Sequence, residues 1–249
     1  MLKILAIGNS FSQDAQAWLH QVLQAAGVEN LVVNLMIGGC TLETHWRHIE
    51  TGEAAYNYEE NGAYPDRKAS IPEMLAEHDW DFIVTQQASH DSGWENTYEP
   101  FLGLIVGYLR EKCPGATLCL QHTWAYEHDS PHWAFMRYHR DQQEMYERLS
   151  AAYKAMAEKY GLVRIPSGEV VQRLRNVKPW RVGERSICRD GFHMDLIFGR
   201  YALACTWARK LAGVKVTGNP FNPSPEGGVG TAALLRIIQK VVDEMVERA

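Results

Sequence analysis

Five short apolar segments, separated by helical patterns, most constrain how this chain can fold. They read as strands at residues 2–7, 31–37, 81–85, 117–121 and 162–165. The helical patterns lie at residues 13–26, 42–49, 71–78, 98–112, 137–160, 168–177, 199–211 and 231–248. Strands that alternate with helices form a parallel sheet covered on both faces, because each crossover packs a helix against it. We therefore expect a three-layer α/β/α fold, in a single domain over residues 1–249.

The first predicted strand leads directly into GNSFS, the sequence of residues 8–12. Ser10 thus follows a core strand and precedes a helix, where backbone N–H groups favour a developing negative charge. This placement makes Ser10 a candidate nucleophile. Ser12 is the rival hydroxyl, but it reads better as the N-cap of the helix that begins near Gln13. A nucleophile on the first strand, with right-handed crossovers, favours a flavodoxin-like five-stranded parallel sheet in the order 2-1-3-4-5.

A carboxylate and an imidazole stand three residues apart near the last third of the chain, in Asp190-Gly191-Phe192-His193. A serine hydroxyl is a weak nucleophile until an imidazole takes its proton, and a carboxylate orients that imidazole. We therefore expect Ser10, His193 and Asp190 to form a catalytic triad. Asp195 is an alternative carboxylate, but it fits better in the first turn of the following helix.

These motifs resemble conserved blocks of the SGNH/GDSL hydrolase superfamily. GNSFS is similar to its first block and DGFH to its last, and IGGCTL at residues 37–42 resembles the block that supplies a glycine N–H to the oxyanion hole. The resemblance spans residues 1 to about 211. It implies a serine esterase without a cofactor, and a poorly characterised bacterial branch of the superfamily is the most similar.

The resemblance also assigns three oxyanion donors. They are the backbone N–H groups of Ser10 and Gly39 and the side chain of Gln86, with Gln87 as the alternative to Gln86. The chain departs from the family pattern twice. Asn9 stands where aspartate is commonest, and a glutamine stands where asparagine is usual, with its amide one methylene further out.

Aromatic side chains in the irregular segments indicate the class of substrate. Residues 51–69 and 123–135 interrupt the regular alternation, so we expect them to form walls of the substrate pocket. Indole rings stack on sugar rings, and the candidates are Trp46, Trp94, Trp124, Tyr126 and Trp133. We expect Gln87, His45 and Trp124 to contact the substrate. A small acyl group, acetyl first, on a carbohydrate is the expected ester, and short-chain lipid esters and thioesters stay open.

Composition argues against several other classes of protein. The net charge of -5 gives no basic surface for nucleic acid, and no apolar stretch is long enough to cross a membrane. The amino terminus lacks the pattern of a signal peptide, which favours the cytoplasm. The five cysteines are odd in number and lack CxxC spacing, so we expect free thiols rather than disulfides or a zinc ribbon. The oligomeric state is not indicated.

Two other functions remain open on the sequence. A non-catalytic carbohydrate-binding protein on the same fold would account for the glutamine at the third block and the aromatic pocket walls. Phosphoester chemistry on a metal site is the second, because four histidines fall within eighteen positions: His122, His128, His132 and His139. Their spacing matches no compact ligand motif, so we expect no metal.

Overall fold

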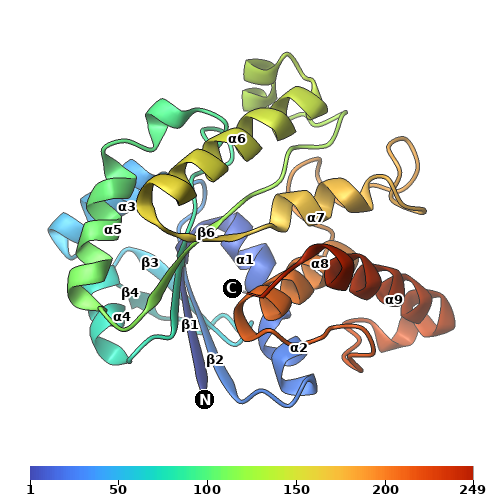
Figure 1. The fold of residues 1–249 in the computed structure, drawn as a ribbon, viewed down its shortest axis with the longest axis horizontal. Helices are drawn as coiled ribbons and strands as arrows, with labels where there is room; N and C mark the ends of the chain where they lie inside the picture. Colours follow the sequence, from blue (N-terminus) through green and yellow to red (C-terminus); the bar gives the residue numbers. More distant parts are fainter. Residues whose placement is uncertain (249) are drawn as a thin grey trace.

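The computed structural model describes residues 1–248 and has an α/β fold around a seven-stranded sheet (Figure 1). Its five parallel strands are, in spatial order, β2 (Asn30–Met36), β1 (Leu2–Gly8), β5 (Phe82–Thr85), β6 (Thr117–Gln121) and β7 (Val163–Ile165). Helices cover both faces of these strands, which accounts for their nearly continuous apolar sequences. Residue 249, the last of the predicted domain, lies outside the described residues.

The expected five-stranded sheet in the order 2-1-3-4-5 is wrong, because two antiparallel strands extend it. They are β3 (Tyr56–Glu60) and β4 (Lys68–Ala69), and the full order is β4-β3-β2-β1-β5-β6-β7. Both strands come from residues 51–69, which we expected to be irregular. β3 has the sequence YNYEE, in which polar residues alternate with buried tyrosines. An edge hairpin of this kind carries no continuous apolar run for sequence analysis to detect.

The helices lie in two layers and extend beyond the end of the sheet (Figure 1). One layer contains α3 (Leu42–Thr51), α4 (Ile71–Glu77) and α5 (Phe101–Lys112), and the other contains α1 (Ser10–Gln16), α2 (Leu19–Ala25) and α8 (Phe198–Trp207), with α9 (Gly228–Met245) packed against α8. The long α6 (Gln142–Tyr160) packs against β7, and α7 (Ser167–Leu174) packs against α8 and α9. Short helical turns are η1 (Glu95–Thr97), η2 (Trp133–Tyr138), η3 (Ala208–Ala212) and η4 (Pro225–Gly227).

All the expected helices are present with shifted limits, and two of them differ most. The helix expected at residues 13–26 is divided into α1 and α2, and α1 begins three residues earlier, at Ser10. The helix expected at residues 137–160 begins only at Gln142, because η2 and a turn with positive φ at His139 and Arg140 precede it. Asp141 then caps α6 by accepting a hydrogen bond from the backbone N–H of Glu144.

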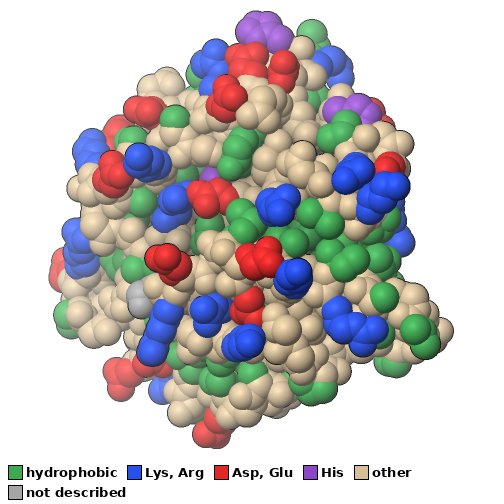
Figure 2. Space-filling model, turned by 45° about the vertical axis from the view of Figure 1, so that its right-hand side comes forward, with side chains coloured by type: hydrophobic (Ala, Val, Ile, Leu, Met, Phe, Trp, Pro, Cys, Tyr) green, Lys and Arg blue, Asp and Glu red, His purple; other side chains and the backbone are tan. Residues whose placement is uncertain are grey.

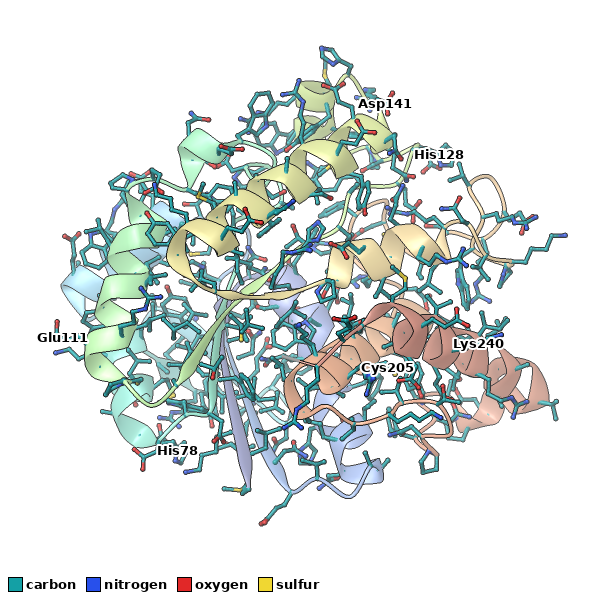
Figure 3. The ribbon with its side chains drawn as sticks, in the orientation of Figure 1. His78, Glu111, His128, Asp141, Cys205 and Lys240 are labelled. Atoms are coloured by element: carbon teal, nitrogen blue, oxygen red, sulfur yellow. The ribbon has the colours of Figure 1, made fainter. Side chains whose placement is uncertain are left out.

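The surface and the thiols agree with the composition. The face in Figure 2 mixes acidic and basic side chains rather than gathering Lys and Arg into a stripe. No helix among residues 1–248 has the length and apolar character to cross a membrane. The five cysteines are free, as expected, and all but Cys113 are buried. Cys205, for example, lies within α8 (Figure 3).

Candidate active site

The turn after β1 presents Ser10 at the carboxyl end of the sheet. Asn9 has extended backbone angles and caps α1, because its Oδ1 accepts a hydrogen bond from the N–H of Phe11 at 3.0 Å. Ser10 is therefore the first residue of α1. Ser12 is not the N-cap that we expected. It is buried in the first turn, and its Oγ lies 2.8 Å from the carbonyl oxygen of Asn9.

Gly8 makes this sharp turn sterically possible. A Cβ at position 8 would lie only 2.3 Å from the Oγ of Ser12, so no larger residue fits without moving the first turn of α1. The glycine therefore allows the strand and the helix to meet closely and brings the Ser10 hydroxyl to the surface of the turn.

The structure brings Ser10, His193 and Asp190 together in one hydrogen-bonded line. The Ser10 Oγ lies 2.8 Å from Nε2 of His193, and Nδ1 of the same ring lies 2.7 Å from Oδ2 of Asp190. Ser10 and His193 are 183 positions apart in the sequence, so the fold alone accounts for their contact. This geometry meets the requirement for a hydroxyl nucleophile, a base within reach of it, and a carboxylate that orients the base.

Local hydrogen bonds keep Asp190 ionised. Partial burial would raise the pKa of this carboxyl, but hydrogen bonds from the His193 ring and from the N–H groups of His193 and Phe192 outweigh it. The pKa of Asp190 is lowered as a result. The alternative, Asp195, instead accepts hydrogen bonds from the N–H groups of Ile197 and Phe198, and it lies just before α8 rather than in its first turn.

A fully buried carboxylate joins the nucleophile's helix to the loop that carries His193. Asp14 stands one turn after Ser10 in α1, and its Oδ2 accepts a hydrogen bond from the Met194 N–H at 2.9 Å. Arg189 and Arg200 also bind Asp14, at 3.0 and 2.8 Å. The sequence analysis missed this residue, although a charged side chain on a buried helical face is a signal for such a contact.

A cavity of about 260 Å³ opens beside the Ser10 hydroxyl. Its lining comes from five segments of the chain: Asn9, Ser10, Phe11, Gly38, Gly39, Ser89, His90, His132, Phe192 and His193. The two phenylalanines give it an apolar floor, and the histidines supply polar edges. His132 lies within residues 123–135, which we expected to form a wall of the pocket, whereas His90 was not among our predicted site residues.

Backbone N–H groups beside Ser10 are available to stabilise an oxyanion. Among residues 1–248, the N–H groups of Ser10, Gly38 and Gly39 form no backbone hydrogen bond outside the helices and strands. Gly39 has a φ of +64°, a conformation that favours glycine, and it lies on the cavity. The predicted donors Ser10 and Gly39 therefore both border the space next to the hydroxyl.

The predicted third donor, Gln86, lies elsewhere. Its side chain is buried, does not line the cavity, and donates a hydrogen bond from Nε2 to Oδ1 of Asn9 at 2.7 Å. Asn9 in turn donates from Nδ2 to the carbonyl oxygen of Cys40. Gln86 and Asn9 thus connect the loops after β1, β2 and β5, three of the five segments that line the cavity. A contact of Gln86 with an oxyanion has no support in this geometry.

The three side chains expected to contact the substrate are fully buried, which corrects that prediction. Gln87 accepts hydrogen bonds from the N–H groups of Leu42 and Ala88 and donates to Thr97. His45 lies 2.8 Å from the hydroxyl of Tyr56. Trp124 stacks on Phe11 at 4.1 Å between ring centroids and donates to the carbonyl of Phe192. These residues support the site from behind.

The histidines that suggested a metal site are dispersed. His122 is buried, with its ring nitrogens near Arg164 and Ser150, whereas His128 and His139 are exposed; Figure 3 labels His128. His132 lies on the cavity. Within residues 1–248, His, Cys, Asp and Glu side chains nowhere gather in threes in a way that would hold a metal ion.

Comparisons with known proteins identify relatives by sequence and by fold. Residues 3–233 match a family model described as a domain of unknown function, DUF4886. A crystal structure of a DUF4886 family protein from Bacteroides uniformis is 36% identical, covers 98% of this chain and 93% of its own, and superposes with a TM-score of 0.90. No curated protein matches the sequence.

More distant structures share the fold. A proposed SGNH hydrolase from Slackia heliotrinireducens is 21% identical, with a TM-score of 0.56 over 84% of this chain and 97% of its own. An acetylxylan esterase from Geobacillus stearothermophilus is 13% identical, with a TM-score of 0.54 over 84% of this chain and 93% of its own. The resemblance to SGNH hydrolases seen in the sequence blocks is thus confirmed in the fold.

Proposed function

We propose that this chain, which belongs to the DUF4886 family, is a serine esterase of the SGNH type. It would form an acyl-enzyme on Ser10. The observation that carries the proposal is the hydrogen-bonded line from Ser10 through His193 to Asp190, which borders a cavity. SGNH hydrolases and acetylxylan esterases among the structures of similar fold support hydrolysis of esters.

Acylation begins when the Ser10 Oγ attacks the ester carbonyl carbon while Nε2 of His193 takes the hydroxyl proton. Asp190 holds the ring orientation and stabilises the imidazolium. The carbonyl oxygen becomes an oxyanion, which the N–H groups of Ser10 and Gly39 stabilise, at about 3 kcal/mol for each well-placed donor. The C–O bond to the alcohol then breaks, and His193 gives its proton to the leaving oxygen.

Deacylation repeats these steps with water. His193 removes a proton from a water molecule, whose oxygen attacks the acyl carbon, and the same oxyanion donors act again. The bond to Ser10 breaks, the carboxylic acid leaves, and the proton returns from His193 to the serine oxygen. The cycle needs no cofactor, because His193 transfers every proton.

A small acyl group, acetyl first, on a carbohydrate is the substrate we propose. The cavity of about 260 Å³ is small, and its apolar lining from Phe11 and Phe192 suits a short acyl chain. The acetylxylan esterase from Geobacillus stearothermophilus and a second acetyl xylan esterase are among the proteins of similar fold. The cavity and these relatives support the class of substrate, but they do not specify the individual sugar.

Hydrolysis of 4-nitrophenyl acetate, butyrate and octanoate tests the proposal. We expect the acetate to be hydrolysed fastest, and Ser10→Ala and His193→Ala each to lower kcat at least about a thousandfold, because the triad acts as a unit. Ser12→Ala is the matched control, since this hydroxyl is buried two residues away and should be dispensable for chemistry.

Labelling by a fluorophosphonate supplies a second readout, independent of the acyl chain. Wild type and the Ser12→Ala variant should be labelled, and Ser10→Ala should not. Cys40 is no rival nucleophile, because burial raises the pKa of its thiol to about 12. A folded wild type that neither hydrolyses the esters nor accepts the label would contradict the proposal and favour the non-catalytic carbohydrate-binding protein.

A further inference from the structure

An exposed aromatic ring continues the wall of the active-site cavity outward. Trp133 is the first residue of η2, and 65% of its surface is exposed. The centroid of its rings lies 5.7 Å from that of His90 and 5.7 Å from that of His132, both of which line the cavity. Large aromatic side chains are usually buried, so an exposed indole beside a cavity suggests that a ligand covers it.

Hydrogen bonds hold this wall in place. The Arg137 guanidinium donates to the carbonyl oxygen of His90 and to Oδ1 of Asp91, the latter at 2.7 Å. The same guanidinium lies 4.7 Å from the ring of Trp94. Arg137 therefore joins η2 to the loop that follows β5, so that Trp133 keeps a fixed position relative to the cavity.

The polar groups beside the indole are ordered as well. Nδ1 of His132 accepts a hydrogen bond from the N–H of Ala134 at 3.1 Å. Because Nδ1 is the acceptor, the neutral ring carries its proton on Nε2 and can donate from there. Burial, and then the neighbouring His90 and His193, lower the pKa of His132, which favours this neutral form.

We propose that Trp133 is the platform on which the sugar ring of the ester stacks, with His90 and His132 at its edge as hydrogen-bonding groups for sugar hydroxyls. This inference rests on the proposed esterase function and adds the binding site of the alcohol part. A flat indole matches the C–H face of a pyranose, and imidazoles match its hydroxyls. An alkyl chain would need the apolar surface but not the adjacent ring nitrogens.

A neighbouring side chain distinguishes the two kinds of occupant. Met136 lies three residues after Trp133, on the same side of a 3-10 helix, and is 66% exposed. A sugar ring needs the flat indole, whereas an alkyl chain would use the flexible thioether as readily. Met136→Ala is therefore the matched control for Trp133→Ala.

The experiment compares ethyl acetate, which has no ring, with acetylated xylo-oligosaccharides, manno-oligosaccharides and glucosamine oligosaccharides. We expect wild type to have a higher kcat/KM for at least one of these sugars than for ethyl acetate. Trp133→Ala should lower that sugar kcat/KM about tenfold, mainly through KM, and leave ethyl acetate within twofold. Trp133→Phe should recover part of the loss, and Met136→Ala should have little effect.

Several results would overturn the platform. One is a wild type whose kcat/KM is higher for ethyl acetate than for every sugar ester. Another is a Trp133→Ala variant that lowers kcat/KM equally for both classes of substrate or for neither. The third is a Met136→Ala variant that is as impaired as Trp133→Ala. If wild type hydrolyses no ester, the proposed function fails, and calorimetry with unacetylated oligosaccharides of the three sugars tests the platform separately. Binding that Trp133→Ala abolishes then supports it, and absence of binding to wild type overturns it.

Discussion

Asn9 is the residue whose side chain joins three of the five segments around the cavity, the loops after β1, β2 and β5. Its Oδ1 accepts hydrogen bonds from the Phe11 N–H and from Nε2 of Gln86, and its Nδ2 donates to the Cys40 carbonyl at 3.1 Å. The commonest SGNH sequence has aspartate here, which would lack the donor. The amide nitrogen of Asn9 therefore suits the Cys40 carbonyl oxygen that faces it. The amide nitrogen of Gln86 in turn suits the side-chain oxygen of Asn9.

Asn9→Asp should lower both stability and activity. A carboxylate oxygen would face the Cys40 carbonyl without a proton between them, at a cost of about 1–3 kcal/mol in the free energy of unfolding. Because Cys40 follows Gly39, we also expect kcat to fall about tenfold as the oxyanion donors move. Urea unfolding and kcat with 4-nitrophenyl acetate measure the two effects.

Asn30→Asp is the matched control for this substitution. Asn30 is also buried and donates from Nδ2 to a backbone carbonyl, that of Val28, at 2.9 Å, but it lies at the start of β2, away from the cavity. It should lose stability and keep its kcat. Equal kcat values for Asn9→Asp and wild type would show that Asn9 has no part in positioning the loops.

At the scale of elements, α1 positions both partners of the catalytic hydrogen bond. Ser10 begins the helix, and Asp14 lies one turn later. Asp14 holds the loop that carries His193 by accepting hydrogen bonds from Arg189 and from the Met194 N–H. Arg189 also donates to the carbonyl oxygen of Met194, which closes the loop on itself. We therefore expect the distance between the Ser10 hydroxyl and the His193 ring to depend on Asp14.

Asp14→Asn tests this dependence. The variant can still accept from Met194 but loses the charge that pairs with Arg189 and Arg200, so we expect the free energy of unfolding to fall by about 3–5 kcal/mol. Looser placement of His193 should lower kcat about tenfold to a hundredfold with KM little changed.

Asp243→Asn provides the comparison at a remote site. Asp14 accepts from one backbone N–H and Asp243 from two, those of Val216 and Thr217, and Asp243 also pairs with an arginine, Arg209. Its loss should reduce the unfolding free energy without changing kcat. If Asp14→Asn behaves in the same way, Asp14 is a structural ion pair and not a positioning residue.

At the scale of the whole molecule, sequence patterns predicted the features that follow from the order of residues along the chain. They missed the features that depend on which way a side chain points in the folded protein. Apolar runs located the parallel strands, and residue types at strand ends pointed to Ser10 and His193. The polar strand β3 has no such run. The orientations of the Gln86 and Trp124 side chains depend on Asn9 and Phe11, which contact them from the start of α1. A sequence alone does not specify those partners.

Buried histidines make the stability of the whole fold depend on pH. Burial, and then the nearby His48, lower the pKa of His45 from 6.5 to about 3. The unfolded chain therefore binds a proton that the folded protein does not. The contribution is present above pH 6.5 and is lost as the pH falls toward 3, at a slope approaching about 1.4 kcal/mol per pH unit.

His45→Asn should flatten this dependence. Asparagine can still form a hydrogen bond with the Tyr56 hydroxyl, 2.8 Å from Nδ1 of His45, but it does not titrate. Urea unfolding at pH 7.5, 6.5 and 5.5 measures the slope, and His128→Asn, which removes an exposed histidine, is the control. Parallel curves for wild type and His45→Asn would mean that His45 takes up its proton without unfolding, so the buried ring would have to reach water in the native state.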